Sequence, residues 1–129
     1  VLLAAPGDGR LMDAIRQVES AGNDAAIGDG GRSVGPYQCG RAAWLDGGGK
    51  ASDYPRLAFN RAATERVMRR YWRRYRAVTD EQKAKCWNVG PRWRTRAAHE
   101  RDGIPIHPGI VAALAAAGVD LPADRAGGP

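Results

Sequence analysis

Glycine-rich and turn-rich stretches divide this chain into short segments with helical periodicity, and this alternation most constrains the fold. Residues 10–21 and 59–77 repeat apolar side chains at the spacing of a helical face. Residues 23–35, between them, are rich in Gly, Asn and Asp. Within that stretch only the pieces near 26–27 and 33–34 favour strands. We therefore predict a mainly α fold with a small β-hairpin.

The remaining segments are also expected to be mostly helical. Further helices are predicted over residues 36–46, 79–88, 93–101 and 108–117, with a loop at 51–55. Thr79 and Gln82 have the spacing of a capping box, in which each side chain accepts a backbone N–H of the other residue. No internal repeat or domain boundary is visible. We expect residues 1–129 to form one domain, with flexible termini at 1–8 and 122–129.

The composition limits the partners. The formal net charge is +6, which favours polyanions such as an acidic cell-envelope polymer, nucleic acid or an anionic surface. No apolar run approaches the roughly 20 residues that span a bilayer, so no membrane span is expected. Residues 1–6 have the character of a secretory-signal remnant, which suggests a secreted or periplasmic protein. A monomer is the default expectation.

The two cysteines, Cys39 and Cys86, leave two alternatives open. In a secreted protein they can form a disulfide that closes a long loop, and otherwise they are two buried thiols. Together with His99 and His107 they match no zinc-binding pattern, and we expect no metal or organic cofactor.

Glu19 is the strongest candidate for a catalytic residue. It ends the first helical segment, one turn from Ile15 and beside the apolar face. A carboxyl at the rim of a core is partly desolvated, so its pKa should rise. Asp29 lies among glycines in the hairpin region, where water and backbone donors should keep it ionised. One buried acid and one exposed carboxylate are the pair that glycoside hydrolysis uses.

Several blocks, in order along the chain, resemble a known family. Val18-Glu19-Ser20, the segment Asp29 to Gln38 (with Gly35-Pro36-Tyr37-Gln38), and Ala43 to Gly47 are similar to successive blocks of the invertebrate-type (destabilase-like) lysozymes. Val67 to Tyr71 resembles the helix that follows, and Ala84 to Pro91 resembles a later segment ending in Gly-Gly-Pro. The same blocks are similar to signatures of bacterial lytic transglycosylases. The resemblance covers about residues 11 to 91.

The resemblance implies an α+β lysozyme-like fold with the hairpin beside an active-site cleft. It implies a secreted, antimicrobial hydrolase, a muramidase that cleaves the β-1,4 bond between N-acetylmuramic acid and N-acetylglucosamine in peptidoglycan. Glu19 matches the catalytic acid and Asp29 the second carboxylate. The expected substrate-binding residues are Ser33, Tyr37, Gln38, Trp87, Asn88 and Gly90.

Alternatives remain open. A lytic transglycosylase would use Glu19 alone, and Asp24 can replace Asp29 if the hairpin register differs. A non-catalytic wall- or polyanion-binding module is a third possibility. Nucleic-acid binding is disfavoured, because the arginines of residues 61–76 point several ways round a helix and most are expected to be solvated. Trp44 is expected in the core.

Overall fold

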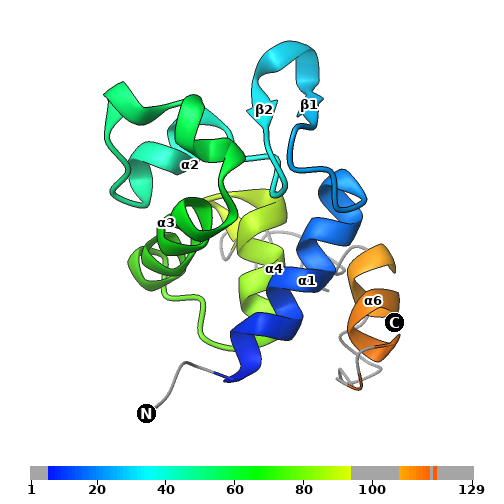
Figure 1. The fold of residues 1–129 in the computed structure, drawn as a ribbon. Coiled ribbons are helices and arrows are strands. Elements are labelled where there is room, and N and C mark those ends of the chain that lie inside the picture. The colour runs from blue at the N-terminus through cyan, green and yellow to red at the C-terminus, as the bar shows by residue number, and fades with distance from the viewer. Residues whose placement is uncertain (1–5, 94–107, 117, 119–129) are drawn as a thin grey trace. The chain divides into compact units, whose positions relative to one another are not determined.

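The chain folds into two compact units of mainly helical structure. The computed structural model describes residues 6–93, 108–116 and 118. One unit contains the described parts of 1–15 and 77–129, and the other is 16–76 (Figure 1). The mainly α class with a small antiparallel pair of strands is confirmed. That the whole chain forms one lysozyme-like domain stays a prediction.

The described elements follow the predicted order, with corrected boundaries. The helices are α1 (Pro6–Ser20), α2 (Arg41–Asp46), α3 (Arg61–Arg74), α4 (Asp80–Val89) and α6 (Pro108–Ala116). The strands are β1 (Ile27–Gly28) and β2 (Ser33–Val34), and the 3-10 turns are η1 (Asp29–Gly31), η2 (Ala51–Asp53) and η3 (Arg56–Phe59). None of these helices combines the length and apolar character needed to cross a membrane.

Some predicted boundaries are wrong. Residues 6–8, assigned to a flexible terminus, form the first turn of α1. The second helix begins at Arg41, because Gln38 adopts a φ of 50° and Cys39 pairs with Val34 instead of entering a helix. The expected loop at 51–55 contains η2. The expected helix at 93–101 lies outside the described residues apart from the buried Trp93, as do His99, His107 and the termini 1–5 and 122–129.

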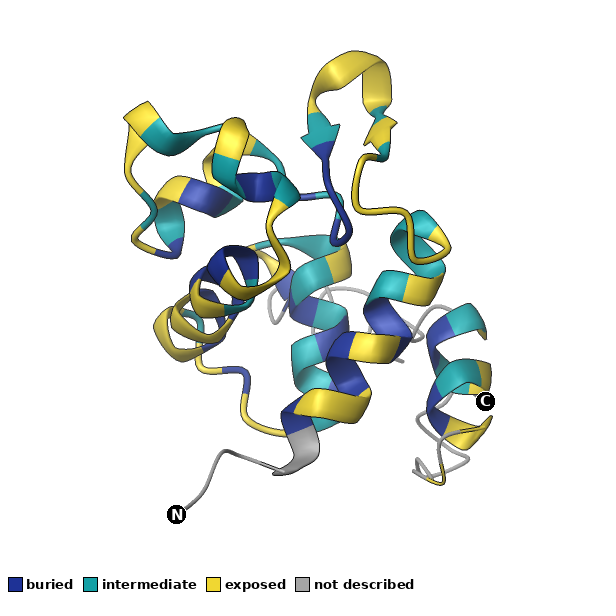
Figure 2. Ribbon diagram, viewed as in Figure 1, coloured by how far each residue is buried: buried dark blue, intermediate teal, exposed yellow. Residues whose placement is uncertain are grey.

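In the unit 16–76, a short hairpin follows the end of α1 (Figure 1). Ile27 pairs with Val34 and Gly28 with Ser33. Gly35, next along the chain, has a φ of 83°, and a Cβ there would lie 2.1 Å from the Ala58 carbonyl oxygen. Only glycine satisfies both the left-handed backbone and this close approach to η3. The tip of the hairpin is exposed (Figure 2).

Helix α3 supplies the core of the same unit. Asn60 caps it by accepting the backbone N–H of Ala63 at 2.8 Å. Its buried residues recur at helical spacing: Ala63, Thr64, Val67, Met68, Tyr71 and Trp72. The predicted helix over 59–77 is therefore shorter at both ends, since Phe59 belongs to η3 and Arg76 has a φ of 60°. Trp44 of α2 is buried, as expected.

In the other unit, α4 begins with the predicted capping box. The Thr79 hydroxyl accepts the Gln82 N–H at 3.1 Å, and the Gln82 side chain accepts the Thr79 N–H at 3.2 Å. Gly90 ends the helix with a φ of 99°. Asp8, in the first turn of α1, is buried and accepts a hydrogen bond from Lys83 Nζ at 2.9 Å. This pair ties the start of α1 to α4.

Candidate active site

Glu19 is a partly buried acid at the end of α1. It occupies the last turn of α1, and the Ala21 and Gly22 backbone turns away immediately after the helix, with φ values of 54° and 80°. Burial raises the pKa of the Glu19 carboxyl above its ordinary value, and the negative charge of Asp29 raises it further. Among the described residues none donates a hydrogen bond to this carboxyl. The fold therefore favours the protonated form of Glu19, which is the form that can donate a proton.

Asp29 is exposed and fixed by its own turn. Its φ of 52° places it in the left-handed region, which Asp tolerates better than most residues. Its carbonyl oxygen accepts the backbone N–H of Arg32 at 3.3 Å and the Arg32 Nε at 3.1 Å. The Ser33 hydroxyl donates to Asp29 Oδ2 at 2.8 Å. Ser33 thus holds the carboxylate of Asp29 in one orientation, and its binding of substrate stays a prediction.

Tyr37 lies in the core, so its assignment as a substrate ligand is corrected. Its side chain has an exposed fraction of 0%, which leaves no surface for a ligand. The phenol donates a hydrogen bond to Glu65 and accepts one from Arg16 Nη1. Arg16 also forms an ion pair with Glu65 at 3.5 Å. Burial, followed by the Glu65 contact, raises the pKa of Tyr37. This network fastens the last turns of α1 to α3 through the turn after the hairpin.

Gln38 is also an internal support. Its Nε2 donates to the carbonyl oxygens of Ala26, at 3.3 Å, and Gly35, at 3.0 Å. Both amide hydrogens are thereby used. A Cβ at Gly28 would lie 2.3 Å from Gln38 Oε1, so the acceptor atom lies against β1. Gln38 therefore braces the hairpin that carries Asp29, and its contact with substrate stays a prediction.

The other predicted binding residues belong to the unit that contains α4. Trp87 is half-buried and Asn88 exposed near the end of that helix, and Gly90 is its C-terminal cap. That these three residues line the side of the cleft opposite Glu19 stays a prediction.

The alternative carboxylate and the cysteines are also placed. Asp24, the proposed substitute for Asp29, is exposed and paired with Arg61 Nε at 2.7 Å. A carboxylate held by a guanidinium is a poorer nucleophile or charge stabiliser than one held only by a hydroxyl. Cys39 and Cys86 are both buried and do not form a disulfide with each other, which favours the second alternative, two buried thiols. Burial raises the pKa of the Cys39 thiol to about 12, so it is not reactive at neutral pH.

Sequence reasoning missed the supports of this site. Arg16 and Glu65 carry no motif, and their role depends on a contact with Tyr37 across 21 and 28 residues of chain. The available signal was the position of Arg16, three residues before Glu19 on the same helix. Among the described residues, no three His, Cys, Asp or Glu side chains converge in a way that would hold a metal ion.

The geometry combines a protonatable acid at a helix end with an exposed carboxylate on a braced turn. No family model matches the chain, and no curated protein or solved structure is significantly similar to it. The chemistry of Glu19 and Asp29 is therefore the main guide to function.

Proposed function

We propose that this chain is a lysozyme-like glycoside hydrolase that cleaves the β-1,4 bond between N-acetylmuramic acid and N-acetylglucosamine in peptidoglycan. One observation carries the proposal: the pKa of Glu19 is raised by burial and by the charge of Asp29, and the described residues provide no counter-charge for Glu19. An acid and a carboxylate in these two environments are the two groups that glycosidic cleavage requires.

In the proposed reaction Glu19 acts first as an acid. It donates its proton to the glycosidic oxygen as the bond to the anomeric carbon breaks. Asp29 attacks that carbon or stabilises the positive charge that develops on the ring. Glu19, now ionised, then takes a proton from the incoming water, which completes hydrolysis. Ser33 contributes by holding one oxygen of Asp29 in place.

Peptidoglycan is chosen as the substrate for two reasons. The ordered blocks around Glu19 and Asp29 resemble those of enzymes that act on this polymer. The net charge of +6 also favours binding to an anionic cell envelope. The charge supports any polyanion, so the identity of the sugar depends on the resemblance.

The test is to incubate the purified protein with purified peptidoglycan and to identify the soluble fragments by mass spectrometry. We expect muropeptides with reducing muramic ends. The matched control is the variant Glu19→Gln, which keeps the shape of the side chain and cannot donate a carboxyl proton.

The ends of the fragments distinguish the alternatives. Ends carrying a 1,6-anhydro sugar would replace the hydrolase by a lytic transglycosylase that uses Glu19 alone, and Asp29→Asn should then have little effect. Fragments released equally by Glu19→Gln would exclude Glu19 as the acid. Release of no fragments, with retained binding to the wall, would favour a binding module.

A further inference from the structure

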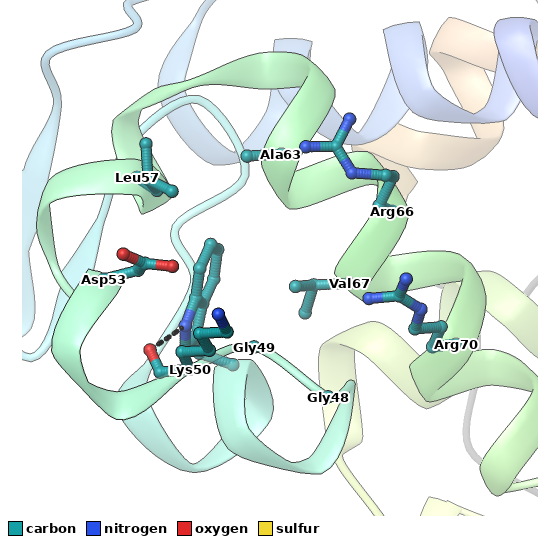
Figure 3. A pocket seen from close by; sticks show the side chains of 10 residues that line it. Gly48, Gly49, Lys50, Asp53, Leu57, Ala63, Arg66, Val67 and Arg70 are labelled. Atoms are coloured by element: carbon teal, nitrogen blue, oxygen red, sulfur yellow. Dashed lines mark hydrogen bonds between the residues drawn. The ribbon is translucent and has the colours of Figure 1, made fainter.

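The unit 16–76 also contains a positively charged pocket, whereas the Glu19–Asp29 site consists of two acids. A pocket of about 170 Å³, open to solvent, is bounded by α2, η2, η3 and α3 (Figure 3). The lining residues are Trp44, Gly48, Gly49, Lys50, Asp53, Leu57, Ala63, Arg66, Val67 and Arg70. None of them belongs to the Glu19–Asp29 pair or to the residues that support it, so this pocket has no part in the proposed hydrolysis.

The pocket has an excess of positive charge. Lys50, Arg66 and Arg70 line it, against one carboxylate, Asp53. Asp53 already accepts a hydrogen bond from Arg56 Nη2 at 3.3 Å. Among the described residues no carboxylate lies within 4.0 Å of the charged groups of Lys50, Arg66 or Arg70.

The two arginines are arranged to act together. Arg66 and Arg70 are four residues apart, so they lie on one side of α3. Figure 3 shows them on that side with Val67 between them, while Leu57 and Asp53 lie across the pocket. Guanidinium groups present planar pairs of N–H donors that match carboxylate and phosphate oxygens.

The glycines after α2 form a further part of the pocket wall, next to α3. A Cβ at Gly47 would lie 2.4 Å from the Val67 carbonyl oxygen, and one at Gly49 would lie 2.3 Å from Trp44 Nε1. The chain therefore packs directly on α3 and on the indole ring. Trp44 Nε1 donates to the Lys50 carbonyl oxygen at 2.9 Å, which fixes the backbone that carries the lysine. These close contacts hold this part of the wall in a fixed conformation.

The size and lining of the pocket limit its ligand. Ligand pockets for drug-sized molecules usually measure about 300–1,000 Å³, so this smaller space accepts a small group or the end of a chain. Leu57, Val67 and Ala63 add apolar surface beside the charges. A bare inorganic anion would leave that surface unused.

We propose that the pocket between α2 and α3 is an anion-binding site for the carboxylate or phosphate end of a small organic ligand with a short apolar portion. Arg66 and Arg70 bind the oxygens, Lys50 adds a third positive charge, and the apolar side chains contact the body of the ligand. The site does not depend on Glu19 or Asp29.

Binding is tested by NMR titration of ¹⁵N-labelled protein with three probes: N-acetyl-D-alanyl-D-alanine, the same dipeptide with a C-terminal amide, and glycerol phosphate. The Trp44 indole N–H lies in the wall of the pocket and reports occupancy by its chemical shift. We expect saturable shifts with at least one anionic probe and none with the amide. Saturation by the dipeptide alone identifies a carboxylate ligand, and saturation by glycerol phosphate alone identifies a phosphoryl ligand.

The variant Arg66→Gln/Arg70→Gln should weaken binding about tenfold or more, because each charge-assisted hydrogen bond contributes strongly to affinity. The matched control is Arg41→Gln/Arg73→Gln, which removes the same charge from two exposed residues outside the pocket. Glu19→Gln should bind as the wild type does. The proposal is overturned if no anionic probe shifts the Trp44 signal, or if the control pair weakens binding as much as the pocket pair.

Discussion

The two ends of α1 each carry an acid, and the two acids differ in their electrostatic surroundings. Asp8 is buried and bonded to Lys83 at 2.9 Å. Glu19 is half-buried, and the charged group that most affects its pKa is another carboxylate, Asp29. A paired acid contributes to the fold, whereas an acid beside a like charge is held ready to exchange its proton. The difference in partner, more than in burial, separates the structural acid Asp8 from the proposed catalytic acid Glu19.

The largest expected effect is on turnover. Glu19→Gln should lower the rate of peptidoglycan cleavage by about 10²–10⁴-fold, because general acid catalysis typically contributes that much. Asp8→Asn should leave the turnover of folded protein unchanged, since Asp8 serves only the fold. Both rates are measured by the release of soluble fragments, normalised to the folded fraction from circular dichroism. A loss of turnover in Asp8→Asn equal to that in Glu19→Gln would remove the distinction between the two acids.

The second effect is on stability at the other end of α1. Lys83→Met should lower the free energy of unfolding by about 1–3 kcal/mol, because it removes the hydrogen bond that Lys83 donates to the buried Asp8. Burial raises the pKa of Asp80 and the charge of Asp8 raises it further, whereas Lys83 lowers it, so the loss of Lys83 also removes a favourable cation from beside Asp80. Urea unfolding at neutral pH measures the change.

The double variant Asp8→Asn/Lys83→Met is the control for that measurement. It removes the pair together, so it should be more stable than the sum of the two single changes predicts. Strict additivity would mean that Asp8 and Lys83 do not stabilise each other.

A smaller effect is expected at Ser33. Its hydroxyl fixes Asp29 Oδ2 through one exposed hydrogen bond of 2.8 Å. Ser33→Ala should lower turnover by about two- to tenfold, since such a bond contributes about 0.5–1.5 kcal/mol. Ser52→Ala changes an exposed serine of η2 and is the matched control. No change in Ser33→Ala would indicate that Asp29 acts without a fixed orientation, or that Glu19 acts alone.

The features that the sequence predicted well depend on local spacing. The hairpin strands, the Thr79–Gln82 capping box and the position of Glu19 at a helix end each follow from residues within a few positions of one another. Local hydrogen bonds and helical periodicity determine such features before any tertiary contact forms.

The features that the sequence did not predict depend on distant partners. Tyr37 looked like a ligand because it lies in a recognisable motif, but its hydroxyl is bonded to Glu65, which is 28 residues away. Gln38 is bonded to Ala26, 12 residues away. Arg66 and Arg70 are exposed, as expected, but the sequence did not predict the pocket that they line, because the wall that carries Lys50 comes from a separate segment. Residue type alone does not show which polar groups are already satisfied.

The smallest effect, and the sharpest test of the comparison, is the pH dependence of stability at Glu19. Its pKa in the folded protein is raised above 4.5, so the fold favours the protonated form. The stability gained from this carboxyl is present below its ordinary pKa and is lost as the pH rises through the raised value. Glu19→Gln never ionises, so it avoids this loss.

The thermal unfolding midpoints of wild type and Glu19→Gln should therefore coincide at about pH 4, and the variant should be the more stable protein at about pH 8. The gain is small because Glu19 is only half-buried and water screens part of the charge. Asp8→Asn should instead lower the unfolding midpoint at about pH 8, since it weakens the hydrogen bond with Lys83. A Glu19→Gln variant that is less stable than wild type at both pH values would mean that Glu19 supports the fold as Asp8 does. If the removal of the Glu19 charge makes the protein more stable, stability does not explain the presence of Glu19, and a role in catalysis does.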